Sequence, residues 1–156
     1  AIPDLGALLA AALEDNYFEA SATALEIAGR HAETLRGDAA FVTKLRATAK
    51  RRMQHFDVRY QQLRVLPLFV PLDEYFAFAD RYRFAENTRL RQAILDGLRR
   101  ALDLGIIGAH DRDATRRFID QMPVTTSDFK PQFMIRESFI QLYQKLSDQD
   151  HGDNPK

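Results

Sequence analysis

The sequence contains no cysteine, which excludes disulfide bonds, a thiol nucleophile and zinc sites built on thiolates. It also has no apolar run that approaches the roughly 20 residues of a membrane-spanning helix. Basic and acidic residues number 22 each, so no excess of one sign favours nucleic acid or an acidic membrane surface as a partner. We therefore expect no membrane span, and because the lack of cysteine fits a reducing compartment, we expect a cytoplasmic location.

The motifs that identify common enzymes are missing as well. There is no glycine-rich phosphate-binding loop and no His-Glu-x-x-His metal motif. No serine lies in the sequence context of a nucleophile elbow. We therefore expect a non-enzymatic protein with no catalytic residue, no cofactor and no metal.

Hydrophobic residues make up 46% of the 156 residues, which is enough for a buried core. They recur mostly at spacings of three and four, the period of amphipathic helices, and we expect Asp38 to cap one of these helices and Gly105 to end another. The sequence predicts an all-α bundle of about six to seven helices, with one domain over 1–146 and a disordered tail over 147–156. Because the chain begins at Ala1 rather than methionine, we expect either a domain excised from a larger bacterial protein or a processed product.

The clearest helical pattern lies in residues 38–64, where an apolar stripe comprises Val42, Leu45, Ala49, Met53, Phe56, Tyr60 and Leu63. Its regular spacing predicts one long central helix of roughly 40 Å, at about 1.5 Å per residue. Phe56 should then be buried in the core. Pro67 and Pro71 would end this helix, because proline lacks an amide donor.

Charge is segregated along the first 64 residues. Residues 1–35 carry six acids and one base, whereas residues 36–64 carry eight bases and two acids. Lys44 and Arg51 lie opposite the apolar stripe, so they are candidate partner-binding residues on a basic helix. The alternative is that an acidic second helix docks beside the basic one and the charges largely cancel. Arg46 and Arg52, on the flanks of the stripe, would then make the contacts.

Aromatic residues are concentrated in 69–84, which holds six of the sixteen in the chain: Phe69, Tyr75, Phe76, Phe78, Tyr82 and Phe84. On a helix that begins near Asp73, Tyr75, Phe78 and Tyr82 follow one line. A helix that is apolar on more than one face is either central in the core or presents one face to a partner. Phe69, Tyr75, Phe78 and Tyr82 are therefore candidate partner-binding residues, with core packing as the alternative.

The segment Asp15–Ala20 resembles the turn of a tetratricopeptide repeat, in which a tyrosine and a small residue interlock neighbouring helices. The resemblance covers one helical hairpin. The following stretch, about one repeat of 34 residues, does not repeat the pattern, so the sequence predicts no array of such repeats.

The pair His110-Asp111 resembles the motif of HD-domain phosphohydrolases, which are all-α enzymes that bind a metal. That resemblance implies His31 or His55 as the first ligand and Asp120 or Asp128 as the last. Arg112-Asp113 follows the pair here, in place of the glycine-lysine common in that family. Asp111 also stands where a helix N-cap is expected, and we interpret it as a capping residue.

Residues 88–122 also fit a helix-turn-helix, whose recognition helix would be Asp111–Met122, with a polar face of Arg112, Thr115, Arg116 and Asp120. The leading hypothesis is nevertheless a helical protein–protein interaction or regulatory module. The alternative is a nucleic-acid-binding domain that uses the basic helix 38–64 or the helix-turn-helix at 88–122, and a metal-dependent phosphohydrolase ranks third. We expect a protein partner, with nucleic acid and self-association left open.

Overall fold

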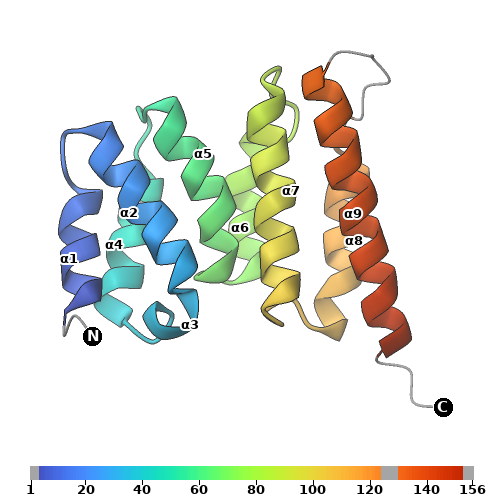
Figure 1. Cartoon of the computed structure of the whole chain (residues 1–156), viewed down its shortest axis with the longest axis horizontal. Coiled ribbons are helices and arrows are strands. Elements are labelled where there is room, and N and C mark those ends of the chain that lie inside the picture. The colour runs from blue at the N-terminus through green and yellow to red at the C-terminus, as the bar shows by residue number, and fades with distance from the viewer. Residues whose placement is uncertain (1–3, 124–129, 153–156) are drawn as a thin grey trace. The chain divides into compact units, whose positions relative to one another are not determined.

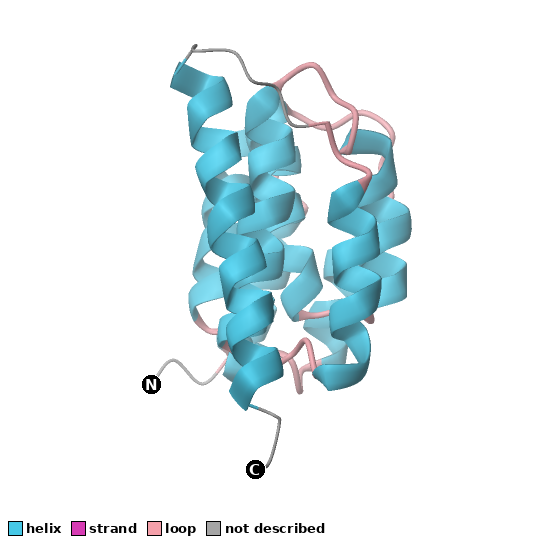
Figure 2. Ribbon diagram, turned by 90° about the vertical axis from the view of Figure 1, so that its right-hand side faces the viewer, coloured by secondary structure: helices cyan, strands magenta, loops and turns pink. Residues whose placement is uncertain are grey.

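The computed structural model describes residues 4–123 and 130–152, with the backbone alone described for 130–135 and 148–152. These residues form nine α-helices and no strand, which confirms the predicted all-α class (Figures 1 and 2). The chain divides into two units, residues 1–70 and 71–156. The prediction of one domain over 1–146 drew no boundary at this point.

The first unit contains five helices: α1 (Leu5–Leu13), α2 (Phe18–Arg30), α3 (Ala32–Leu35), α4 (Ala39–Ala49) and α5 (Phe56–Val65), followed by a 3-10 turn at Leu66–Leu68. Helices α1 and α2 form a hairpin, α1 also packs on α4, and α2 packs on α5. The first helix of each pair therefore contacts the first of the other, and the second contacts the second. This is a stack of two helical hairpins.

The prediction of one long helix over 38–64 is wrong. Helix α4 ends at Ala49, and α5 begins only at Phe56. In the segment between them, Met53 is 90% exposed, although the sequence placed it on the apolar stripe. Phe56, expected in the core, is only partly buried, whereas Leu63 is fully buried. The apolar spacing of three and four continues through the non-helical residues 50–55. The periodicity alone therefore did not reveal that the helix is interrupted there.

A buried polar cluster accounts for the break between α4 and α5. The Arg59 guanidinium, on a residue that is 6% exposed, donates to the backbone oxygens of Ala49 at 2.9 Å and Arg51 at 2.8 Å. It also donates to the Gln62 side chain at 2.8 Å. The last carbonyls of a helix have no partner within the helix. Arg59 supplies partners at the end of α4, so the chain can turn there without leaving buried oxygens unsatisfied.

Close approach of α1 to α4 depends on Gly6. Asp38 precedes α4, and its side chain accepts a hydrogen bond from the Phe41 amide at 3.0 Å, which confirms the predicted N-cap. A Cβ added at Gly6 would overlap with Asp38 Oδ2 and lie 2.9 Å from its Cγ. The absence of a side chain at Gly6 thus lets α1 pack against the capped end of α4.

The second unit contains α6 (Leu72–Ala79), α7 (Thr88–Asp103), α8 (Arg112–Asp120) and α9 (Lys130–Gly152), with 3-10 turns at Asp80–Tyr82 and Ala109–Asp111. Helix α7 packs on α9, and Phe76 of α6 stacks on Phe118 of α8 at 4.4 Å between ring centroids. Gly105, at a φ of 73°, ends α7 as the sequence predicted. Helix α9 continues to Gly152 and so includes residues 147–152, which the sequence analysis assigned to a disordered tail.

We expect Arg59→Met to lower the free energy of unfolding by about 3 kcal/mol, because it removes charged hydrogen bonds and leaves buried carbonyls unpaired. The matched control is Arg52→Met, since Arg52 is exposed in the segment between the helices. That change should alter stability by no more than about 0.5 kcal/mol. Urea unfolding of both variants measures the difference, and equal losses would contradict the role assigned to Arg59.

We expect Leu63→Ala to cost about 2–5 kcal/mol of stability, as a cavity in a fully buried site does. Phe56→Ala should cost less, although it deletes a larger side chain, because Phe56 already contacts solvent. Thermal and urea unfolding give the two values. A larger loss of stability for Phe56→Ala than for Leu63→Ala would contradict this account and place Phe56 in the core, as a continuous helix requires.

We expect Gly6→Ala to destabilise the first unit, because the new methyl group displaces the Asp38 carboxylate from the Phe41 amide. Loss of an N-cap alone costs about 1 kcal/mol. In an Asp38→Ala background the glycine substitution should cost less, since the overlapping atoms are gone. A double-mutant cycle measures this coupling. Strictly additive losses would show that residues 6 and 38 do not interact.

Candidate functional site

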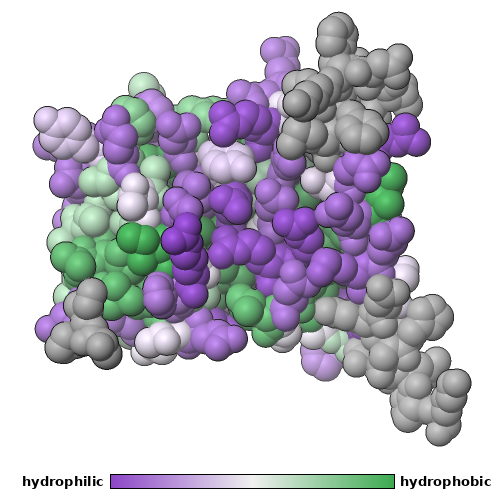
Figure 3. Space-filling model, in the orientation of Figure 1, coloured by the Kyte–Doolittle hydropathy of each residue, from purple (hydrophilic) through white to green (hydrophobic). Residues whose placement is uncertain are grey.

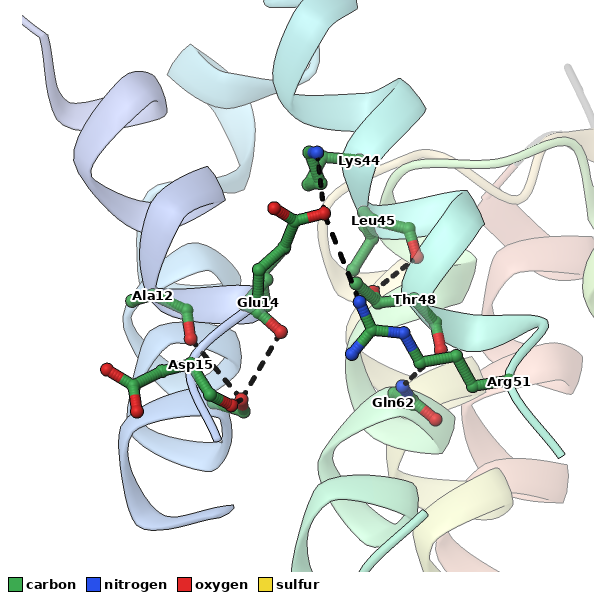
Figure 4. A network of polar contacts seen from close by, with 10 residues as sticks. Ala12, Glu14, Asp15, Lys44, Leu45, Thr48, Arg51 and Gln62 are labelled. Atoms are coloured by element: carbon green, nitrogen blue, oxygen red, sulfur yellow. Dashed lines mark hydrogen bonds and ion pairs between the residues drawn. The ribbon is translucent and has the colours of Figure 1, made fainter. Parts of the chain in front are cut away.

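Lys44 and Arg51, the two candidate partner-binding residues on the basic segment, both face one carboxylate of the N-terminal hairpin. Glu14 Oε1 lies 2.7 Å from Lys44 Nζ and 3.9 Å from Arg51 Nη2 (Figure 4). The acidic N-terminal segment thus offsets charge on the basic one. Sequence reasoning assigned such contacts to Arg46 and Arg52 and expected α2 to supply the acid, whereas Glu14 directly follows α1. Binding of a partner by Lys44 and Arg51 stays a prediction.

The hydrogen bond from Lys44 and the charge of Lys44 hold the pKa of Glu14 below its ordinary value, and Arg51 adds a smaller effect. A carboxyl with a lowered pKa contributes stability above its unfolded pKa and loses it as the pH falls through the folded value. The pair therefore persists near neutral pH. Its members are 37% to 50% exposed, so salt weakens the attraction.

A polar hollow of about 500 Å³ opens beside this ion pair, where the α1–α2 and α4–α5 connections meet. It is lined by Asp15, Asn16, Phe18, Ser21, Arg51, Met53, Gln54 and His55. The rings of Phe18 and His55 stack at 3.5 Å with an interplanar angle of 7°. Asp15 and Arg51 both line the hollow, so its charge favours neither cations nor anions.

A second depression, here called the apolar groove, runs between α1 and α2. Its volume is about 390 Å³, and it is lined by Leu8, Leu9, Ala12, Glu19, Ala20, Thr23, Ala24 and Ile27. Leu8 is 58% exposed, and Figure 3 shows hydrophobic residues gathered over α1 and α2. Apolar residues gathered in one depression point to an interaction site more than a single exposed leucine does, since single exposed leucines are ordinary.

The apolar groove has an acidic setting. Residues 4–35 contain Asp4, Glu14, Asp15, Glu19, Glu26 and Glu33 against a single base, Arg30. Arg30 is engaged by Glu26 at 2.8 Å on the same helix. Glu19 lines the groove itself, and no base in the described part of the chain pairs with it. The groove therefore combines apolar walls with a negative edge.

Sequence reasoning did not identify the apolar groove. The available signal was the composition of α1, LGALLAAAL, in which every residue is apolar or glycine. A surface helix normally keeps only one apolar stripe. Leu9 and Leu13 of α1 are buried, whereas Leu8 and Ala11 are exposed. The excess of apolar residues thus marked a second face.

The aromatic segment 69–84 contributes mainly to packing. Tyr75 has an exposed fraction of 0%, and burial raises the pKa of its hydroxyl well above the ordinary value, with a further contribution from Asp96. The candidate role of Tyr75 as a partner contact is therefore corrected, since none of its surface is accessible. Phe69, Phe78 and Tyr82 are partly buried, and each ring lies near another. Partner contacts by these three stay a prediction.

The polar residues of the proposed recognition helix, Asp111–Met122, make contacts within the chain. Arg112 is 4% exposed and Thr115 is fully buried, with its hydroxyl donating to the Asp111 backbone oxygen at 2.8 Å. Arg116 pairs with Asp113 at 3.2 Å. Asp120 accepts the Tyr143 hydroxyl, and burial together with this bond raises the pKa of Tyr143 to about 12. No observation here favours the nucleic-acid alternative.

The metal motif suggested by His110-Asp111 does not assemble among the described residues. His110 is exposed on the turn Ala109–Asp111, and no group of three His, Asp or Glu side chains in residues 4–123 and 136–147 is placed to hold a metal. Asp128, one of the implied ligands, lies outside the described residues. Asp111 precedes α8 as expected, but its side chain makes no capping bond, so that part of the prediction is wrong.

None of the helices in the described part of the chain has both the length and the hydropathy needed to cross a bilayer. Comparisons of the chain with protein-family models, with curated protein sequences and with solved structures gave no significant match.

Proposed function

We propose that the chain is a non-enzymatic helical protein–protein interaction module that regulates its partner by binding it. The observation that carries this proposal is the apolar groove between α1 and α2. In helix-in-groove recognition, a partner helix lays its apolar face into a hydrophobic groove of the receptor. The proposed setting is the bacterial cytoplasm, supported by the absence of cysteine from the sequence.

The walls of the groove are held in place by contacts on the other sides of both helices. Helix α1 is fixed through Gly6 against Asp38 and through Glu14 against Lys44. Helix α2 is fixed by its packing on α5 and by Leu25, which is fully buried. A preformed site loses little conformational entropy on binding, so even a modest apolar contact area contributes to affinity.

The test uses the lack of native cysteine, because a single thiol can be introduced for labelling. Thr23→Cys places a photo-crosslinker in the groove, and Thr43→Cys places one at an exposed site on α4. Irradiation in a lysate of the source cell should capture a protein at residue 23 that is absent at residue 43. That protein, identified by mass spectrometry and purified, should bind the chain directly.

Leu8→Ser should abolish this binding without changing the melting temperature, because Leu8 is already 58% exposed. Leu104→Ser is the matched control, since Leu104 is 42% exposed at the end of α7 and lies outside the groove. Isothermal titration calorimetry compares the variants. Equal affinity of the wild type and Leu8→Ser for the purified partner would contradict the proposed function.

A further inference from the structure

We infer that the occupant of the apolar groove is an amphipathic α-helix with an apolar face flanked by basic side chains. This inference rests on the proposed function and specifies the chemistry of the partner. It is carried by three observations within the first unit: the spacing of the lining residues, the distribution of charge around them, and the packing of the two hairpins.

The lining residues form two mainly apolar stripes, one on each helix. Leu8 and Ala12 lie one turn apart on α1, and Ala20, Thr23 and Ile27 share one face of α2. The small side chains between the larger Leu8 and Ile27 leave room for the ridge of an incoming helix. An extended strand would need unpaired backbone groups at the receptor surface, which these two helices do not offer.

The charges at the groove select the flanks of that helix. Glu19 lines the groove and has no basic partner among the described residues, while Arg30, the one base in residues 4–35, is engaged by Glu26. Lysine or arginine beside the apolar face of the occupant would meet the Glu19 carboxylate. An acidic flank would face like charge and be disfavoured.

The same charges argue against a second copy of this chain as the occupant. A two-fold contact brings the same surface together from both copies. The groove of each copy, with Glu19 at its edge, would then meet the same acidic edge of the other copy. A helix from a different protein, with an apolar face and basic flanks, would contact the apolar walls with its face and the acidic edge with its flanks.

The packing of the first unit shows how such a helix would be accommodated. The hairpin α1–α2 is covered on one side, where α1 meets α4 and α2 meets α5. The stripe of Ala20, Thr23 and Ile27 lies on a different side of α2 from the buried residues Ser21, Leu25 and Ala28. An added helix there would continue a helix-on-helix stack, in which each layer buries the apolar face of the one before.

The experiment uses two synthetic peptides of about 18 residues, or five helical turns, that share one leucine face. One carries lysine and the other glutamate at every polar position. Fluorescence anisotropy with the full chain at low salt should show the lysine peptide binding at least about tenfold more tightly. This preference should shrink as salt is added, because the contributing charges are exposed.

Glu19→Gln should weaken the lysine peptide by about two- to fivefold, as loss of an exposed charge pair does. Glu33→Gln is the matched control, since it removes the same charge from α3, away from the groove lining. Leu8→Ser should abolish binding of the lysine peptide, and circular dichroism melting confirms that each variant is folded.

Each other outcome overturns a defined part of the account. Equal binding of the two peptides, lost in Leu8→Ser, would leave the groove as a helix-binding site but contradict the basic flank. Lysine-peptide binding that survives Leu8→Ser would remove the groove as its site. Absence of peptide binding, together with a dimer by sedimentation that Leu8→Ser dissociates, would identify a second copy as the occupant.

Discussion

The buried guanidinium of Arg59 is the interaction on which the first unit depends. It lies where α4 stops, and it donates to the backbone oxygens of Ala49, the last residue of the helix, and of Arg51 just beyond it. A buried charge is costly unless hydrogen bonds surround it. Here the hydrogen bonds to the Ala49 and Arg51 backbone oxygens offset the cost of burying the charge, and these oxygens would otherwise lack a partner among the described residues. Gln62 completes the cluster, since its side chain accepts from Arg59 and donates to Thr48.

Because the chain turns at that point, α4 and α5 form a pair rather than one rod. The pair presents two helices to the N-terminal hairpin, and α1 and α2 each dock on one of them. Gly6 and the Asp38 cap fix the first contact, and the Glu14–Lys44 pair lies beside it. The side of α1–α2 that remains contains the apolar groove. The apolar groove is thus held in place by α4 and α5, although no residue of these two helices lines it.

Local signals in the sequence were sufficient for the fold class and for several helix ends. The apolar spacing predicted helices throughout, Asp38 was identified as a cap, and Gly105 as a stop. Each depends on chemistry within a few residues of the position concerned. The break at 50–55 was missed because the partners of the α4 carbonyls come from Arg59, a turn into the next helix, and because the apolar stripe ran on unchanged.

The candidate site was harder to predict than the fold. Lys44 and Arg51 were placed correctly on the basic segment, but their acidic neighbour, Glu14, is distant in sequence and became visible only through the docking of α1. Tyr75 was a candidate partner contact, with packing in the core as the alternative, because the sequence pattern fits both environments. Its complete burial in the structure favours the core. The groove arises from two stripes on separate helices, neither of which is exceptional alone.

Amide hydrogen exchange, followed by NMR on the labelled chain, tests the central feature of this account most directly. In the described structure, the amides of residues 52–55 lie outside the helices, whereas those of α4 and α5 beyond the first turn of each helix are in helical hydrogen bonds. Rapid exchange at 52–55, with slow exchange at Leu45 and Leu63, is the predicted result. Uniform protection from residue 42 to residue 63 would show a continuous helix and contradict the stacked hairpins that create the groove.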